Sequence, residues 1–284
     1  MITDCHTHIF SPAVRENADL YRVQDPVFRE LYASSKARIL TADELVRAMD
    51  AAGVDRAVVC ALAWGTQALC VQHNDAIIDA VQRYPERLIG FFIVAPGERE
   101  AALREVERCV GAGLRGVGEA RAGAGGWDLA DRDGMKDILD ALEAYRLPLL
   151  LHTDEPVGHL YPGKGNMTPD RLAAFLALRP ALTVILAHFG GGLPFYALMP
   201  EVRAVFANVY VDSAAAPFVY TPEVYSHVAE AIGVDKVLFG SDYPLMPYKR
   251  AFNHLEAAGL TPEEREAVLG ANAARLFDRA LSAK

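Results

Sequence analysis

Side chains that bind metal ions recur along this chain, each at or just after the end of a short apolar segment. They begin with a His-Thr-His triplet and continue past residue 240: His6, His8, Glu119, His152, His188 and Asp242. Neutral imidazoles and carboxylates are ordinary ligands of Zn²⁺ and related divalent ions. The set predicts a divalent metal centre that acts on a small-molecule substrate, provided that the fold brings these residues together.

The apolar segments before these residues are typical of parallel strands that are buried on both faces, because they are rich in Val, Ile and Leu. Eight such segments are found: 1–6, 56–62, 88–94, 114–119, 147–152, 182–188, 209–212 and 236–240. The stretches between them have helical character. Thr41, Thr168 and Thr261 are expected to begin helices, and Gly53 is expected to end one.

The spacing of the segments predicts an α/β fold, a single (β/α)8 TIM barrel that occupies residues 1–284 as one domain. From the second strand onward the units are about 25–35 residues long, the size of one βα unit. The first connection is longer, so residues 10–40 are expected to be an insertion after strand 1. Segments 121–134 and 153–168 are expected to be further loops, and the sequence leaves open whether they cover the site.

A barrel would explain why the metal-binding types follow strands. The C-terminal ends of barrel strands converge on one small volume, and residues two apart on a strand face the same side. Each residue also has a structural explanation: the histidines could be satisfied by backbone hydrogen bonds, Glu119 could pair with Arg115 or Arg121, and Asp242 could cap a turn. The joint pattern, with five of eight strand ends carrying these types, favours the metal centre.

Composition limits the other classes of function. The net charge of −9 argues against nucleic-acid binding, which usually needs a basic face. No apolar run approaches the roughly 18 residues of a membrane span, and no signal peptide is recognised. Four scattered cysteines form no C-x-x-C pair. A cytoplasmic protein with reduced thiols and no membrane partner is expected.

Several motifs resemble the amidohydrolase superfamily, specifically the amidohydrolase-related group that includes aromatic acid and aminocarboxymuconate-semialdehyde decarboxylases. They span nearly the whole chain: DCHTHIF at 4–10, YPERLIGFFIVAP at 84–96, GLRGVGE at 113–119, LLLHTDEP at 149–156, LAHFGG at 186–191, LFGSDYP at 238–244 and NAARLF at 272–277. The resemblance implies metal ligands at His6, His8, His152 and Asp242. His188 would be a second-metal ligand or a catalytic histidine, and a homodimer is suggested.

Glu119 departs from the pattern of many members, which bridge two metals with a carboxylated lysine on strand 4. A glutamate there resembles the subset in which Glu bridges the metals, whereas members that decarboxylate usually lack an acidic residue at this position. The WDL at 127–129 is similar to a segment in the decarboxylase branch. The sequence therefore leaves one or two ions open; Zn²⁺ is expected, with Mn²⁺, Fe²⁺ or Co²⁺ as alternatives.

Our main expectation from sequence is hydrolysis of a C–N, ester or lactone bond. A bound divalent ion would activate water, Asp242 would act as general base, and His188 would stabilise the oxyanion or hold the second metal. The alternative is non-oxidative decarboxylation of a small aromatic or unsaturated acid, with Asp242 or His188 protonating the carbon. A third possibility is a metal-binding or scaffold barrel that catalyses no reaction. It would need a closed coordination shell with no open position for water.

Substrate contacts are expected from the loops. Arg121 could pair with a carboxylate through its planar fork, although a surface ion pair is an equal alternative. Trp64 could form an apolar wall or simply pack in the core. His159 and Tyr161 could reach the substrate if the segment after His152 folds over the site.

Overall fold

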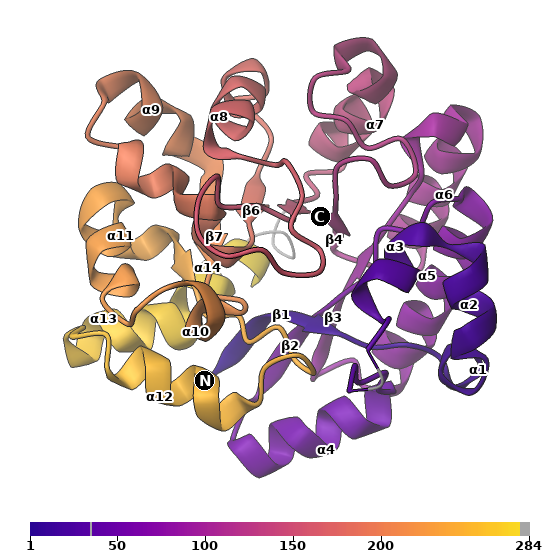
Figure 1. Ribbon diagram of the computed structural model, residues 1–284, viewed down its shortest axis with the longest axis horizontal. Helices are drawn as coiled ribbons and strands as arrows, with labels where there is room; N and C mark the ends of the chain where they lie inside the picture. The colour runs from indigo at the N-terminus through magenta and orange to yellow at the C-terminus, as the bar shows by residue number, and fades with distance from the viewer. Residues whose placement is uncertain (35, 279–284) are drawn as a thin grey trace.

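The computed structural model describes residues 1–34 and 36–278, in which eight parallel strands form one sheet in the order β1 to β8. In Figure 1 the helices surround these strands, as in a (β/α)8 barrel. The strands are β1 (Thr3–His8), β2 (Arg56–Cys60), β3 (Leu88–Phe92), β4 (Gly116–Ala120), β5 (Leu149–Leu151), β6 (Val184–Leu186), β7 (Val209–Asp212) and β8 (Val237–Leu238). The expected fold is confirmed, and each strand lies within or beside its predicted segment.

The connections between the strands contain the helices. The α-helices are α1 (Pro12–Glu16), α2 (Ala18–Gln24), α3 (Pro26–Leu31), α4 (Ala42–Ala52), α5 (Gln67–Arg83), α6 (Arg99–Gly111), α7 (Arg132–Ala144), α8 (Pro169–Leu178), α9 (Pro200–Val205), α10 (Ala216–Val219), α11 (Val224–Ile232), α12 (Tyr248–Glu256), α13 (Pro262–Glu266) and α14 (Asn272–Asp278). Short 3₁₀ segments are η1 (Pro96–Glu98), η2 (His188–Tyr196), η3 (Phe206–Asn208) and η4 (Val234–Lys236), and η5 (Ala267–Ala271) is a π-helical turn.

The predicted insertion after strand 1 is folded into the three short helices α1 to α3, which precede α4. The expected signals of α4 are present: Thr41 and Glu44 form a capping box, and Gly53 ends the helix with φ of 72°. That left-handed conformation is favourable for glycine because it has no Cβ. Thr261 and Glu264 form the same box at α13, whereas Thr168 precedes Pro169 at the start of α8.

The barrel closes where β1 meets the chain that follows β8. The Cys5 amide donates to the Phe239 carbonyl at 2.7 Å, and the His8 amide donates to the Tyr243 carbonyl at 2.8 Å. In the other direction, the Asp242 amide donates to the His6 carbonyl at 2.9 Å. This seam places Asp242 beside the histidines of β1, although the two segments are far apart in sequence.

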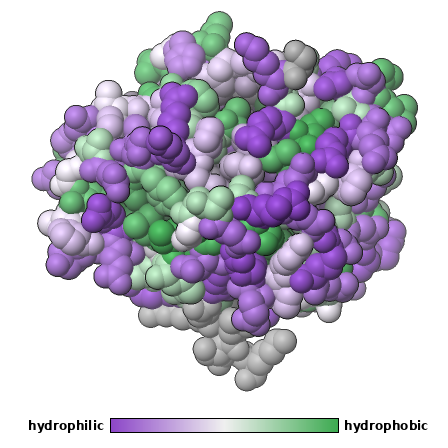
Figure 2. Space-filling view, turned by 90° about the horizontal axis from the view of Figure 1, so that it is seen from below, coloured by the Kyte–Doolittle hydropathy of each residue, from purple (hydrophilic) through white to green (hydrophobic). Residues whose placement is uncertain are grey.

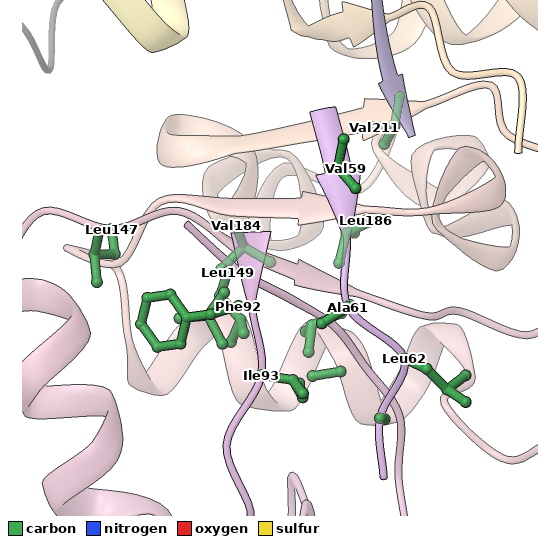
Figure 3. Close-up of a cluster of buried hydrophobic side chains, with 14 of the residues drawn as sticks. Val59, Ala61, Leu62, Phe92, Ile93, Leu147, Leu149, Val184, Leu186 and Val211 are labelled. Atoms are coloured by element: carbon green, nitrogen blue, oxygen red, sulfur yellow. The ribbon is translucent and has the colours of Figure 1, made fainter. Parts of the chain in front are cut away.

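Two buried clusters lie on the two sides of the strands. The larger contains residues of the strands and of the surrounding helices, and Figure 3 shows part of it, with Val59, Leu149 and Val184 among the labelled side chains. The smaller cluster contains alternate strand residues, such as Phe91, together with Phe277 of α14, whose ring lies 5.9 Å from that of Phe91. The smaller cluster therefore fills the barrel interior away from the strand ends that carry the polar residues.

The outer surface is mainly polar. On the face shown in Figure 2, hydrophilic side chains cover most of the area and apolar ones form patches between them. Among the described residues, no helix combines the length and the apolar character needed to cross a membrane.

Gly118 is expected to be essential for packing β4 against β5. Its φ is +132°, and a Cβ at this position would lie 2.4 Å from the Leu150 carbonyl oxygen. A Gly118→Ala variant is therefore expected to lose about 2–4 kcal/mol of unfolding free energy, because both the backbone conformation and the contact become unfavourable. Chemical denaturation with the linear extrapolation method measures the loss.

Gly111→Ala is the matched control, because a Cβ there would meet no atom within 4 Å and the residue lies at the end of helix α6. It is expected to be as stable as the native protein or slightly more stable. Equal unfolding free energies for the two variants would contradict the role given to Gly118.

Candidate metal centre

The six residues predicted as metal ligands meet at the C-terminal ends of the strands. Four are buried, with exposed fractions of 0% for His6, 8% for His8, 7% for His188 and 8% for Asp242. The Nε2 atoms of His6 and His8 are 3.2 Å apart, and the Asp242 Oδ1 lies 3.5 Å from the His8 Nε2. The convergence follows from the barrel, which brings the ends of strands 1, 4, 5, 6 and 8 into one volume.

Glu119 lies between two pairs of histidines. Its Oε2 is 3.5 Å from the Nε2 of His6 and 3.6 Å from that of His8. Its Oε1 is 2.9 Å from the Nδ1 of His152 and 3.5 Å from the Nε2 of His188. Two groups of potential ligands therefore share this carboxylate, one with His6 and His8 and the other with His152 and His188.

The ring nitrogens that face away from the cluster lie beside hydrogen-bond acceptors. In His6 the Nδ1 is 2.9 Å from the Asp212 carboxylate, and in His188 it is 2.9 Å from the Ala214 carbonyl. The Nδ1 of His8 is 3.2 Å from the Cys60 carbonyl. These acceptors favour a proton on the outer nitrogen of each ring and therefore a lone pair on the inner one.

His152 has the opposite orientation to the other three histidines. Its Nδ1 faces the cluster, 3.2 Å from the His188 Nε2, and its Nε2 faces outward, 3.3 Å from the Asp154 Oδ1. With the outer nitrogens protonated, the inner nitrogens of neighbouring rings would face each other as lone pairs. Such an arrangement is unfavourable unless a cation lies between them, so the donor set fits a divalent metal.

The electrostatics of the cluster also favour a cation. Burial alone would raise the pKa of Glu119, but the charges of His6 and His152, together with hydrogen bonds from His152 and His188, hold it well below its ordinary value. Burial lowers the pKa of His152, yet the neighbouring Glu119 and Asp154 outweigh burial and raise it to about 10. The carboxylates therefore create a negative environment in which a proton or a metal ion is stabilised.

Left-handed backbone conformations direct two of these residues into the site. His188 has φ of 55° and Asp242 has φ of 65°, which are uncommon for residues with a Cβ. The His188 amide donates to Asp212 at 3.2 Å, and Gly191 comes so close to Asp154 that an added Cβ would lie 2.4 Å from the Asp154 carbonyl oxygen. Close backbone approach thus explains Gly191, whereas Gly190 and Gly192 have positive φ values of 65° and 91°.

Arg121, which was predicted to bind substrate, joins three loops beside the centre. Its Nη2 lies 3.3 Å from the Glu30 carboxylate on α3, and the amide of Gly163 donates to the same carboxylate at 3.0 Å. The Nη1 of Arg121 is buried and has no hydrogen-bond partner among the described residues. The ion pair is therefore real, but it leaves one guanidinium nitrogen available, and substrate binding by Arg121 stays a prediction.

Trp64 is 1% exposed and lies in an aromatic cluster with the insertion. Its ring stacks on Phe28 with centroids 5.3 Å apart, and its indole N–H donates to the His73 Nδ1 at 2.8 Å. These contacts match the packing role that the sequence left open. A direct substrate contact from Trp64 is not tested by them.

His159 and Tyr161 lie in the segment between β5 and α8, which passes in front of the strands in Figure 1. The rings are 5.7 Å apart, and the Tyr161 hydroxyl donates to the Glu155 carboxylate at 2.9 Å. His159 is exposed, whereas Tyr161 is partly buried. Their predicted contact with substrate also stays a prediction.

Three polar residues near the centre were missed by the sequence analysis. Asp154 and Asp212 face the outer nitrogens of His152 and His6, and the only signal for them was their position directly after a strand or at its end. Tyr32 comes from the insertion, and burial together with the charges of Asp242 and Glu119 raises the pKa of its hydroxyl. No local pattern predicted it.

The barrel and the candidate metal centre at its strand ends together have the architecture of a (β/α)8 enzyme. A model of the amidohydrolase family matches residues 3–279, and the chain therefore belongs to that family. The resemblance of the motifs is confirmed.

Relatives in the same family are decarboxylases. Gamma-resorcylate decarboxylase from Polaromonas sp. is 25% identical over 288 residues, which covers 83% of this chain and 86% of the relative. The structure of 5-carboxyvanillate decarboxylase from Sphingomonas paucimobilis superposes with a TM-score of 0.82 at 20% identity and covers 98% of each chain. A dihydroxybenzoic acid decarboxylase from Polaromonas sp., with bound manganese, superposes with a TM-score of 0.72 at 21% identity and covers 98% of this chain and 96% of its own.

These comparisons correct the main functional expectation. The prediction of a hydrolase that cleaves a C–N, ester or lactone bond is wrong, because the similar proteins are decarboxylases of aromatic acids. The error came from Glu119, whose acidic character was taken to disfavour decarboxylation. The comparisons also give no specific support to zinc, since the metal named with the related structures is manganese.

Proposed function

We propose that this protein is a metal-dependent, non-oxidative decarboxylase of a small hydroxylated aromatic carboxylic acid. The observation that carries the proposal is the match over 83% of the chain to a gamma-resorcylate decarboxylase. The histidine and carboxylate cluster at the C-terminal ends of the barrel strands supports it. The related 5-carboxyvanillate decarboxylase and 2,6-dihydroxybenzoate decarboxylase have the same barrel fold.

His6, His8, His152 and Asp242 would hold a divalent ion, with Glu119 and His188 as further ligands if a second ion binds. When bound, the ion supplies positive charge for the substrate carboxylate and an adjacent oxygen. Manganese and zinc both fit imidazole and carboxylate ligands, and availability often selects between such ions. Manganese is supported by a related structure that contains it, whereas zinc is supported by the number of histidines among the candidate ligands.

The reaction requires a proton at the ring carbon that carries the carboxylate. Asp242 or His188 would deliver this proton, the C–C bond to the carboxylate would then break, and its electron pair would restore the aromatic ring as CO₂ leaves. Both residues are buried, with exposed fractions of 8% for Asp242 and 7% for His188, which limits the access of water to the protonated carbon. Positioned acids of this kind contribute about 10²–10⁴-fold in rate.

Substrate would be oriented by residues of the surrounding loops. The Nη1 of Arg121, which has no hydrogen-bond partner among the described residues, suits an anionic oxygen of the substrate. His159 and Tyr161 belong to the segment between β5 and α8, and they would contact the substrate only if that segment covers the bound substrate. Because Trp64 is buried, it would stabilise the neighbouring aromatic residues, such as Phe28, rather than contact the substrate directly.

The test is release of CO₂ from a panel of aromatic acids by protein loaded with Mn²⁺ or Zn²⁺. The panel contains 2,6-dihydroxybenzoate, 5-carboxyvanillate and unsubstituted benzoate, and CO₂ is measured together with the decarboxylated product. We expect turnover of a hydroxylated acid, no turnover of benzoate, and loss of activity after treatment with a chelator. Absence of CO₂ from every hydroxylated acid, with metal bound, would overturn the proposal.

A further inference from the structure

Asp154 is a buried carboxylate that organises the segment between β5 and α8. It is 1% exposed and lies two residues after His152. Its Oδ1 accepts a hydrogen bond from the Gly165 amide at 2.6 Å, and its Oδ2 accepts one from the Met167 amide at 2.9 Å. The Asp154 amide in turn donates to the Met167 carbonyl at 3.1 Å. One side chain thus joins the two ends of the 153–168 segment.

The same carboxylate faces a candidate metal ligand. Its Oδ1 lies 3.3 Å from the Nε2 of His152, on the side of the ring opposite to the cluster, and this nitrogen is buried and forms no hydrogen bond with any other described residue. The inner nitrogen of His152 is Nδ1, whereas His6, His8 and His188 present Nε2 to the cluster. An imidazole that binds a cation through Nδ1 carries its proton on Nε2, and that proton needs an acceptor.

We propose that Asp154 is the positioning residue of His152: it selects the tautomer with the proton on Nε2, turns Nδ1 toward the metal, and links this orientation to the conformation of the 153–168 segment seen here. The inference rests on the metal centre of the proposed function and is independent of the reaction. Burying a carboxylate is costly unless it has strong partners, and two backbone N–H groups supply hydrogen bonds while the His152 imidazole lies 3.3 Å away.

Other contacts hold the same segment without touching His152. The Glu30 carboxylate accepts from the Gly163 amide at 3.0 Å, and the Tyr161 hydroxyl donates to Glu155 at 2.9 Å. One mutation can therefore weaken the attachment of the 153–168 segment without changing the group that faces His152, and another can change that group. Glu30→Gln weakens one attachment of the segment, whereas Asp154→Asn changes the group that faces His152.

The experiment compares the full-length native protein with the Asp154→Asn and Glu30→Gln variants. Affinity for Mn²⁺ is measured by competition with a chelator, and the segment is probed by the rate of trypsin cleavage after Lys164. We expect Asp154→Asn to lower the affinity by about 10–100-fold, the usual effect of removing a partner of a metal-binding histidine. Glu30→Gln is expected to accelerate cleavage and to leave the affinity within about twofold of native.

A measurement on the native protein needs no variant. Long-range ¹H–¹⁵N spectra of the Zn²⁺-loaded protein distinguish a His152 ring that is protonated on Nε2 from one that is protonated on Nδ1. Protonation on Nδ1, unchanged affinity in Asp154→Asn, or equal loss of affinity in the two variants would each overturn the role of Asp154. Failure of the native protein to bind Mn²⁺ or Zn²⁺ would instead remove the metal centre itself.

Discussion

An Asp242→Asn variant is expected to lose about 10²–10⁴-fold in kcat while its fold stays intact, because an amide cannot supply the proton that a carboxyl group supplies. Asp242 is 8% exposed and lies 3.5 Å from the His8 Nε2. The substitution is nearly isosteric, so packing at the seam between β1 and β8 is retained. The measurement is kcat at saturating metal with the hydroxylated acid that releases CO₂, together with metal content and thermal unfolding.

Asp128→Asn is the control for Asp242→Asn. Asp128 lies in the loop between β4 and α7 with its side chain 53% exposed, so its replacement tests the effect of removing one negative charge outside the centre. It is expected to retain native kcat. Near-native kcat in Asp242→Asn would show that another group, with His188 as the first candidate, delivers the proton.

The second large effect is expected for Glu119→Gln. The two oxygens of Glu119 face different pairs of histidines, and an amide replaces one of those acceptors by an NH₂ group. If two ions bind to the native protein, the variant is expected to hold one ion or none, and kcat is expected to fall by at least about tenfold. Elemental analysis of both proteins after dialysis against excess Mn²⁺ gives the ratio of metal to chain.

The outcome for Glu119 separates two roles. A loss of metal identifies Glu119 as a ligand that two ions share. Unchanged stoichiometry, in contrast, would restrict Glu119 to orienting His152, whose Nδ1 lies 2.9 Å away. Glu155→Gln is the control because Glu155 is buried, at 7% exposure, and its described hydrogen bond is to Tyr161, outside the cluster.

Much of the architecture could be predicted because buried parallel strands have a recognisable composition. The sixth predicted strand was 182–188, and β6 is shorter, at Val184–Leu186, because the left-handed backbone of His188 turns the chain away. The eighth, 236–240, is reduced to Val237–Leu238 for a related reason: the following residues bond across the seam to β1 instead of continuing the strand.

The convergence of the site followed from residue type and strand position, but its finer organisation did not. Sequence gives no information about which imidazole nitrogen faces inward, so the reversed ring of His152 and the role of Asp154 could not be foreseen. Tyr32 reaches the centre through stacking with Phe28, whose centroid lies 4.7 Å from its own. That contact depends on the tertiary packing of short helices, for which local patterns carry little signal.

The reaction was the least predictable property. Hydrolysis and decarboxylation both use a cation held by imidazoles and carboxylates, together with a nearby acid or base. Glu119 changes the charge and the number of ligands in the centre, but it does not determine which bond of the substrate breaks. The match to related enzymes was therefore needed to distinguish the two chemistries.

The seam between β1 and the residues after β8 determines when the proposed metal centre is completed during synthesis. Because a chain is synthesised from its N-terminus, His6 and His8 leave the ribosome before Asp242 and the carbonyls that pair with β1. The proposed ligand set is therefore complete only once residue 242 has emerged. A ribosome-bound chain truncated before residue 242 is expected to retain less metal than the released protein.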